Sequence, residues 1–365
     1  MSFAPNHFSL PVRTVITLAL ALAAAELCVW FRVPLPWMIG PLLGTALLTI
    51  VGGPSGSWGP LRNAGQWTIG CALGLYFTPD VARLVGGLWW ALALGIFWAL
   101  ALGLGFAAWL RWVHQRPGWL YLPGLSPITA YFASPIGAAS EMTQLSERHG
   151  AQPDLVASAH SLRVLMVTLI IPFGFQWAGF QGLDTSLPGA RAVHGPGLAL
   201  LVFLTFLGCW LMVRLERANP WFIGALTVSL LLTASGVTLS SLPQGLTNAA
   251  QLAIGISLGV RFTPGFVHQA PRWLASVALA TLVMIGLSAG FALVLSQGVD
   301  LHWATLLLAT SPGGIAEMAI TAKVLQLGVP VVTAFHVTRL AGVLLLVEPI
   351  YRRWYRVPAP AGAVL

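Results

Sequence analysis

The sequence predicts an all-α polytopic membrane protein built from two homologous repeats. Hydrophobic residues make up 57% of its 365 positions, charged residues only 8%, and the mean hydropathy is +0.82. A soluble domain of this length needs roughly a quarter of its residues charged, so water is not the main solvent of this chain. Apolar stretches recur along the whole length, and several motifs of the first half return in the second. Together these observations predict a duplicated set of membrane helices.

Twelve apolar stretches are long enough to be membrane segments. Each is expected to be helical, because a backbone inside the bilayer must satisfy its own hydrogen bonds. A linker rich in Gly, Pro and polar residues, 181–196, divides the stretches six and six. We therefore expect a first membrane repeat at 1–180, a second at 197–356 and a C-terminal tail at 357–365. In chain order the stretches lie at about 15–31, 35–51, 63–77, 87–110, 125–146, 155–176, 197–213, 220–236, 247–262, 274–296, 302–326 and 331–350.

Three motifs occur in the same order in both halves, which identifies a duplication. The Pro-Trp-Met-Ile-Gly run at 36–40 returns as Pro-Trp-Phe-Ile-Gly at 220–224. Residues 61–79 align without gaps to 246–264, and 11 of 19 positions are identical. A Ser-Pro-x-Gly motif then leads to a Glu-Met pair. In both halves a His follows that Glu 19 residues later and an Arg follows it 22 residues later.

The distribution of positive charge predicts that the repeats are inverted. If all twelve segments cross the membrane, the Lys and Arg outside it divide equally between the two faces. If the two Ser-Pro-x-Gly segments instead enter and leave on one side, twelve of these charges share a face and four lie opposite. Each such segment has two apolar arms of about ten to twelve residues, which rise only about 15 to 18 Å. We therefore expect five full crossings and one re-entrant or broken Pro-Gly segment per inverted repeat, with both termini in the cytoplasm.

The Pro-Gly breaks are candidate binding sites. A break inside the membrane frees N–H and C=O groups, which are tolerated only when buried in protein or lining a polar cavity. The arm that follows begins with free N–H groups able to hold an anion. The alternative is a pair of kinks used only for packing. The break residues are Pro135 and Gly137 in the first half, and Pro312, Gly313 and Gly314 in the second.

Charged residues gather near these breaks in both halves. A Glu at membrane depth costs at least about 2.5 to 3.5 kcal/mol, so we expect each Glu to pair with the Arg on the next helix. Such a cluster suits binding of a solute or exchange of a proton, because an imidazole titrates near neutral pH. The alternative is a pair of structural Glu–Arg contacts that fasten each segment to its neighbour. The clustered residues are Glu141, His160 and Arg163, then Glu317, His336 and Arg339.

Gln66 and Gln251 occupy matching positions on the third segment of each half, each preceded by an Asn-Ala step. Their amides are suited either to lining the site or to hydrogen bonding between helices, which is the commoner role of an amide in a membrane.

Several classes of function lack support. The net charge of +8 is dispersed along the chain and forms no basic cluster, so no nucleic-acid partner is expected. The three cysteines stand in apolar stretches with no spacing typical of a metal site, and no cofactor is expected. A membrane monooxygenase would need clustered His and carboxylates for copper or iron, but the eight His show no pair three or four residues apart. We therefore expect that the chain is not an enzyme.

The motifs PWMIGPLLG, Asn-Ala-x-Gln, SPGGIAEM and His-x-x-Arg resemble the AbrB-type bacterial membrane protein family, over about residues 12–355. The resemblance implies an inner-membrane protein, and members are described variously as candidates for a regulator of gene expression, an ammonia monooxygenase or a transporter. It implies no substrate. In the first half Pro135-Ile136-Gly137-Ala138 departs from the family's Pro-Gly-Gly pattern and adds one residue before Glu141. Equal roles for the two breaks are therefore not assured.

These features favour a secondary transporter of a small solute, with an anion favoured over a cation, across the bacterial inner membrane, coupled to a proton or Na⁺. The alternative is a membrane-embedded regulator or sensor that affects gene expression indirectly. The lipid bilayer is the expected surrounding in either case, and homo-oligomerisation stays open.

Overall fold

The computed structural model describes residues 8–180, 182, 192–265 and 271–354. This part of the chain forms fifteen α-helices and no β-strand, as the composition predicts. The helices are α1 (Leu10–Trp30), α2 (Pro36–Ile50), α3 (Gly59–Gly74), α4 (Pro79–Gly87), α5 (Trp89–Gln115), α6 (Pro127–Phe132), α7 (Ala139–Arg148), α8 (Pro153–Trp177), α9 (Gly195–Arg214), α10 (Pro220–Ala234), α11 (Gln244–Gly259), α13 (Pro271–Leu295), α14 (Trp303–Thr310), α15 (Ile315–Val324) and α16 (Val329–Trp354).

Within the described residues six helices are long and apolar enough to cross a membrane, namely α1, α5, α8, α9, α13 and α16. Four more of the expected crossings, α2, α3, α10 and α11, have 15 or 16 residues. At 1.5 Å per residue they are about 22 to 24 Å long, which is less than a hydrocarbon core of about 30 Å. The chain is therefore multi-pass, and its shorter apolar helices lie against other helices.

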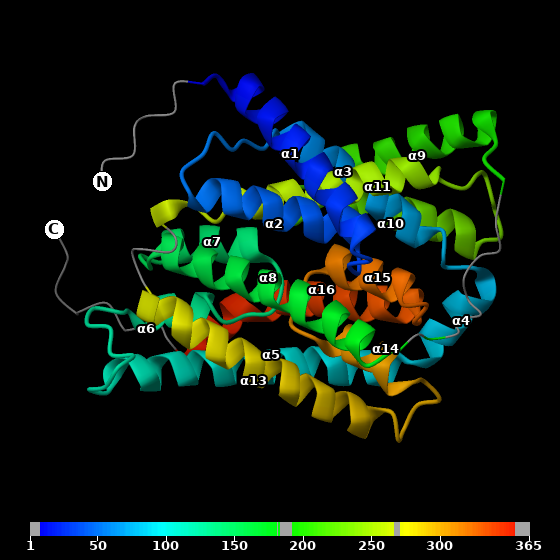
Figure 1. Ribbon diagram of the computed structural model, residues 1–365. Coiled ribbons are helices and arrows are strands. Elements are labelled where there is room, and N and C mark those ends of the chain that lie inside the picture. Colours follow the sequence, from blue (N-terminus) through cyan, green and yellow to red (C-terminus); the bar gives the residue numbers. More distant parts are fainter. Residues whose placement is uncertain (1–7, 181, 183–191, 266–270, 355–365) are drawn as a thin grey trace, which may run out of the picture.

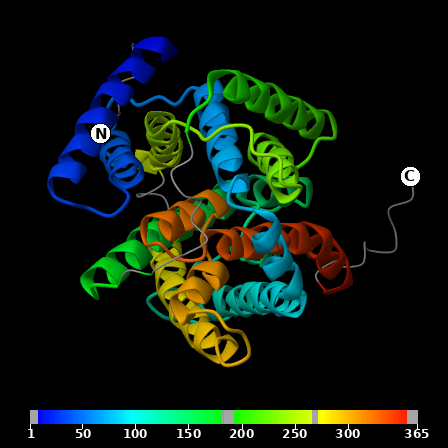
Figure 2. The ribbon, with the colours of Figure 1, turned by 90° about the vertical axis from the view of Figure 1, so that its right-hand side faces the viewer.

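The helices form two bundles, one above the other in Figure 1. Bundle I contains α1–α3 and α9–α11, and bundle II contains α5–α8 and α13–α16, with α4 beside both (Figures 1 and 2). Each bundle takes helices from both predicted repeats, because the chain passes from bundle I to bundle II twice. The predicted repeats are therefore sequence units that interleave in space.

Bundle I is held by two equivalent close contacts between the halves. A Cβ placed on Gly70 of α3 would lie 2.4 Å from the carbonyl oxygen of Phe222 on α10. A Cβ on Gly255 of α11 would lie 2.6 Å from the carbonyl oxygen of Met38 on α2. Gly70 and Gly255 match in the repeat alignment, and so do Met38 and Phe222. The two halves thus exchange the same contact, and the small residue lets each pair of backbones approach.

Candidate functional site

Both Ser-Pro-x-Gly segments are broken helices. In the first half α6 ends at Phe132 and α7 begins at Ala139, and in the second α14 ends at Thr310 and α15 begins at Ile315. The additional residue of the first break is accommodated by two successive left-handed residues, Gly137 (φ 99°) and Ala138 (φ 53°). The corresponding Gly314 has an extended backbone (φ −81°). The difference in sequence therefore gives the two breaks different shapes.

The first broken segment is a hairpin that opens at the N-terminal end of α8. Thr129 in the first turn of α6 accepts a 3.0 Å hydrogen bond from the backbone N–H of Gln152, which directly precedes α8. Its two arms therefore begin and end at the same end of the molecule, with the break between them in the interior. The residues of that break, Ser134 and Pro135, are buried.

The second hairpin opens at the opposite end of α8. His302, which precedes α14, packs its ring 4.9 Å from that of Phe180, just after α8. Leu325, which follows α15, accepts a 2.9 Å hydrogen bond from the backbone N–H of Gly182. The short arms of the two segments thus approach from opposite ends, in agreement with the expected re-entrant geometry (Figure 1). The inverted orientation of the complete repeats stays a prediction.

Each break is held by an Arg and a His from the next long helix. Arg163 of α8 donates hydrogen bonds to the carbonyls of Ser134 (3.2 Å) and Pro135 (2.7 Å). His160 contacts the carbonyl oxygen of Phe132 at 3.0 Å through Nε2 and Arg163 at 2.7 Å through Nδ1. A helix end leaves carbonyls without partners and carries partial negative charge. The guanidinium satisfies both needs.

The second half repeats this arrangement. Arg339 of α16 donates to the carbonyls of Ser311 (2.6 Å) and Gly313 (2.7 Å). His336 contacts the carbonyl oxygen of Leu308 at 2.9 Å and Arg339 at 2.9 Å. All four side chains are buried. We call the set His160, Arg163, His336 and Arg339 the His–Arg braces.

The hydrogen bonds of the braces define the tautomer of both imidazoles. An Arg N–H can only donate, so Nδ1 of each His accepts, and a carbonyl can only accept, so Nε2 carries the hydrogen. Neither ring nitrogen has a lone pair left for a solute or a proton. In this conformation both imidazoles are therefore fully hydrogen-bonded, and the proton exchange that the sequence suggested for His160 and His336 stays a prediction.

The predicted Glu–Arg pairs do not form. Within the described part of the chain the ion pairs are Arg83–Asp80 and Arg352–Glu348, both at helix surfaces. Glu141 and Glu317 instead occupy the third position of α7 and α15, next to the free N–H groups of each helix start. The expected pairing was wrong because the carbonyl ends of α6 and α14 take the guanidinium groups.

The two carboxylates have different surroundings. Glu317 is only 7% exposed, whereas Glu141 is half-buried. The Glu317 carboxylate folds back over the start of its helix, since a Cβ on Gly314 would lie 2.0 Å from its Oε2 atom. Only a glycine leaves space for the carboxylate at this position. Glu317 is therefore a buried carboxylate with no ion-pair partner within the described chain.

A cavity of about 600 Å³ lies where the two breaks meet, between bundles I and II. Its wall includes Pro312, Gly313, Gly314 and Gly137 from the breaks, together with both predicted Glu, both His and both Arg. Gln66 of α3 also lines it, but Gln251 of α11 is buried outside its lining. Pro135 lies behind the wall, where its carbonyl is bound by Arg163. Eleven of the thirteen predicted residues therefore face one space.

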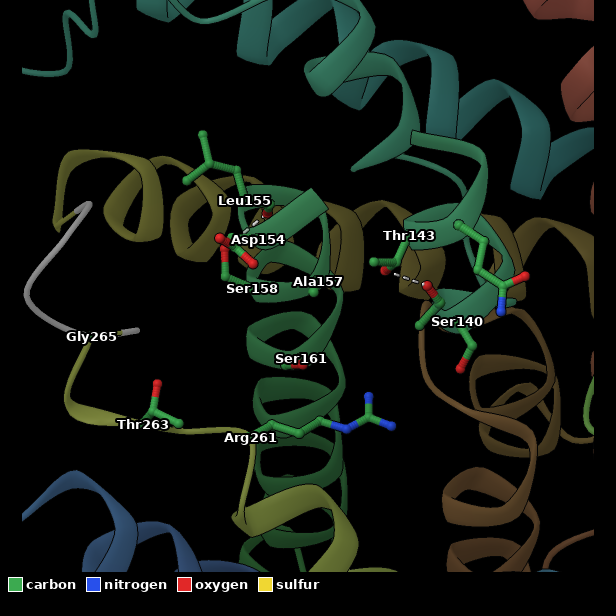
Figure 3. Close-up of a pocket in the computed structure, with 12 residues that line it drawn as sticks. Ser140, Thr143, Asp154, Leu155, Ala157, Ser158, Ser161, Arg261, Thr263 and Gly265 are labelled. Atoms are coloured by element: carbon green, nitrogen blue, oxygen red, sulfur yellow. Dashed lines mark hydrogen bonds between the residues drawn. The ribbon is translucent and has the colours of Figure 1, made fainter. Parts of the chain in front are cut away.

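A second cavity of about 670 Å³ adjoins the first. We call it the vestibule; Figure 3 shows its wall, formed by α7, the first turns of α8 and the residues after α11. Most of its polar side chains carry hydroxyl groups, with Ser140, Thr143, Ser158 and Thr263 among them. Ala139, Ser140, Gln144 and Arg261 line both cavities. The two cavities are therefore neighbours that share this wall.

No group of three or more His, Cys, Asp or Glu among the described residues is arranged to hold a metal ion. The three cysteines, Cys28, Cys71 and Cys209, are free thiols.

The chain is similar to known proteins over most of its length. The family described as transition state regulatory protein AbrB matches residues 37–355. The chain belongs to the AbrB family. It is similar to the Escherichia coli (strain K12) protein named "Putative regulator AbrB", with 28% identity over 261 residues that cover 67% of this chain and 71% of that protein. It is also similar to "Uncharacterized protein YhjN" of Bacillus subtilis (strain 168), with 23% identity over 242 residues, or 62% of this chain and 63% of that protein. No solved structure matches it.

Two cavity residues of this AbrB-family protein escaped the sequence analysis. Arg62 and Arg261 were counted only as positive charges outside the membrane, yet both line the central cavity. Neither Arg is repeated in the other half, where Thr247 matches Arg62 and Tyr76 matches Arg261. Each Arg is a charge that breaks the repeat inside an otherwise matching segment, and Arg261 directly precedes the repeated Phe-Thr-Pro motif. This departure from the repeat is the signal that could have identified them.

Proposed function

We propose that this AbrB-family protein is a secondary transporter of a small anionic solute, with its site in the central cavity. The observation that carries the proposal is the meeting of two oppositely directed broken helices at one polar cavity inside an apolar helical protein. Discontinuous helices with charged groups at their ends are the usual way in which a membrane protein builds a solute site near the bilayer midplane.

The charge of the cavity wall supports binding of an anionic solute. Its wall carries five Arg and three Glu, a formal excess of two positive charges, and the starts of α7 and α15 add the partial positive charge of a helix N-terminus. Because the His–Arg braces are not neutralised by carboxylates, their charge contributes to this field. The charged wall residues are Arg62, Arg163, Arg217, Arg261, Arg339, Glu141, Glu216 and Glu317.

Glu317 supports coupling to a proton. A buried carboxylate without a counter-ion is costly in its charged form, and it is most easily accommodated by taking up a proton. The carboxylate faces the space in which the solute would bind. Solute and proton would therefore influence each other directly, which is the requirement for coupled transport. Na⁺ is the alternative coupling ion.

The division into two bundles suits a mechanism in which the cavity opens alternately to the two sides of the membrane. The cavity lies between them, so a movement of bundle II against bundle I would carry both breaks past the fixed wall of α3, α10 and α11. Rigid-body movement of one bundle around a central site is the common mechanism of this class. The proposal includes an inner-membrane location, cytoplasmic termini and inverted repeats, and it involves no enzymatic step.

Transport by purified protein tests the proposal. Proteoliposomes are screened by solid-supported-membrane electrophysiology against organic acids, amino acids and inorganic anions, with an isotope-uptake screen for electroneutral exchange. The expected result is a saturable, solute-dependent signal that protein-free liposomes lack. Silence in both screens would contradict transport and favour the regulator.

The regulator hypothesis rests on one observation, the description of the matching family and the name of the Escherichia coli relative. It predicts a change in gene expression on deletion that a transport-dead variant corrects as well as the wild type does.

A further inference from the structure

Arg261 stands out among the charged residues of the cavities. Its side chain extends across α8 past Ser161, toward the side on which Ser140 lies (Figure 3). Arg261 lines both the vestibule and the central cavity, so it stands where the two spaces join. No other charged residue lines both. Its guanidinium is therefore the charged group shared by the two cavities.

The Arg261 guanidinium is uncommitted. It forms no hydrogen bond and no ion pair with any residue in the described ranges, although the side chain is half-buried. Arg163 and Arg339 direct their terminal N–H groups at the breaks, and the Nε of each has no partner among the described residues. Half-buried Arg62 also lines the central cavity with an unpartnered Nε, but it does not line the vestibule. Arg261 is thus the arginine at the junction whose donors are available to a ligand, and a guanidinium is well suited to a carboxylate or phosphate.

Two charged residues of the central cavity lie within electrostatic range of Arg261: Arg62, which acts more strongly, and Glu317, which does not contact it as an ion pair. The ionised Glu317 carboxylate is itself a negatively charged group in the wall of the central cavity. A solute anion near Arg261 and an ionised Glu317 therefore compete for the same positive charge.

We propose that Arg261 is the residue that selects anions at the junction of the two cavities, and that Glu317 opposes this selection while it is ionised. The inference deepens the proposed transport function and rests on it for its biological meaning. Its physical content, a local preference for anions over cations, is independent of transport. Because Tyr76 replaces Arg261 in the first half, the selecting charge belongs to one half only.

Charge-selective thiol labelling tests this directly. Val164 and Ala157 lie two turns apart on one face of α8, about 10 Å along the helix. Val164 lines the central cavity and Ala157 lines the vestibule. Each is replaced by Cys in a Cys28→Ser background, and the residual labelling of buried Cys71 and Cys209 is subtracted. The probes are an anionic sulfonatoethyl and a cationic trimethylammonioethyl methanethiosulfonate, with rates normalised to a free thiol.

We expect the anion-to-cation rate ratio at Val164→Cys to fall about tenfold with Arg261→Gln and to persist with Arg261→Lys, as one partly screened charge within about 10 Å requires. At Ala157→Cys the change should be smaller. Glu317→Gln should raise the ratio at Val164→Cys. If Arg261→Gln leaves the rate ratio unchanged, Arg261 does not select anions. If Glu317→Gln leaves the ratio unchanged, Glu317 does not compete with the anion for the charge of Arg261. Both results stand whether or not a transported solute is found.

Discussion

The Arg339 guanidinium donates a 2.7 Å hydrogen bond to the carbonyl of Gly313, inside the second break. Arg163 makes the matching 2.7 Å bond to Pro135 in the first break. In each half the Arg thus stabilises backbone carbonyls after a short helix, which would otherwise lack hydrogen-bond partners in the protein interior. The same arrangement fixes where the following helix starts, and with it the position of the carboxylate at the cavity.

Replacing either Arg by Lys should destabilise the fold. Arg163→Lys and Arg339→Lys keep the charge, but an ammonium cannot hold two carbonyls and a His nitrogen in the geometry of a planar fork. We expect each variant to lower the free energy of unfolding by about 2 to 3 kcal/mol, as for a buried charged hydrogen bond. Arg83→Lys, whose pair with Asp80 is exposed, is the control and should change little. Denaturant titration in detergent, followed by Trp fluorescence, measures the difference; equal effects in all three would contradict the brace.

The equivalent glycine contacts of bundle I predict equivalent effects. Gly70→Ala and Gly255→Ala place a Cβ 2.4 Å and 2.6 Å from backbone oxygens, which cannot move aside as a side chain can. Each should cost about 1 to 3 kcal/mol, the usual cost of overpacking. Gly286→Ala on α13 has open space around its Cβ, and its better helix propensity should make it neutral or slightly stabilising. Unfolding curves of the three variants are measured under one set of conditions. If the three curves coincide, the close contacts at Gly70 and Gly255 are refuted.

Gly314→Ala should impair function while the fold is retained. Its Cβ would meet only the Glu317 carboxylate, at 2.0 Å, and a flexible side chain can turn away. The displaced carboxylate would no longer lie over the start of α15. We expect the maximal transport rate to fall at least fivefold, about 1 kcal/mol in the barrier, with an unfolding curve close to that of the wild type. A variant that unfolds, or one with wild-type transport, would show that Gly314 does not position Glu317.

The hairpins that open at opposite ends of α8 predict the membrane topology. Trp119 precedes α6 and is 77% exposed, and Trp177 ends α8 and is 93% exposed. With the native cysteines replaced, Trp119→Cys should react with an impermeant maleimide only from the cytoplasmic side. Trp177→Cys should react only from the other side. Reaction of both from one side would exclude the inverted arrangement.

Much of this architecture was readable from the sequence, because duplication and apolar length are properties of the chain itself. The breaks at Pro135 and Pro312 were predicted, since Pro and Gly cannot continue a helix without loss. The partners of Arg163 and Arg339 were not predictable in the same way. Sequence separation pairs opposite charges, but it gives no account of carbonyls that a break leaves free. The role of Arg261 depends on where the residues that follow α11 lie relative to α7 and α8, which no local pattern encodes.

The difference between Gln66 and Gln251 has a similar origin. The two occupy identical positions in the alignment, yet only Gln66 reaches the cavity. Bundle I is nearly symmetric, but the helices of bundle II that face it carry breaks of different shape. The repeat in the sequence therefore predicted the pair, but not that its two members would have different surroundings.

Proton movement with the solute tests the central claim most directly, namely that solute and proton meet at Glu317. Proteoliposomes loaded with the pH-sensitive dye pyranine are given the solute that the transport screen identifies, in wild type, Glu317→Gln and the half-exposed control Glu141→Gln. We expect solute-dependent acidification in the wild type, its loss in Glu317→Gln with solute exchange retained, and a smaller effect in Glu141→Gln. Undiminished proton uptake by Glu317→Gln would contradict the account.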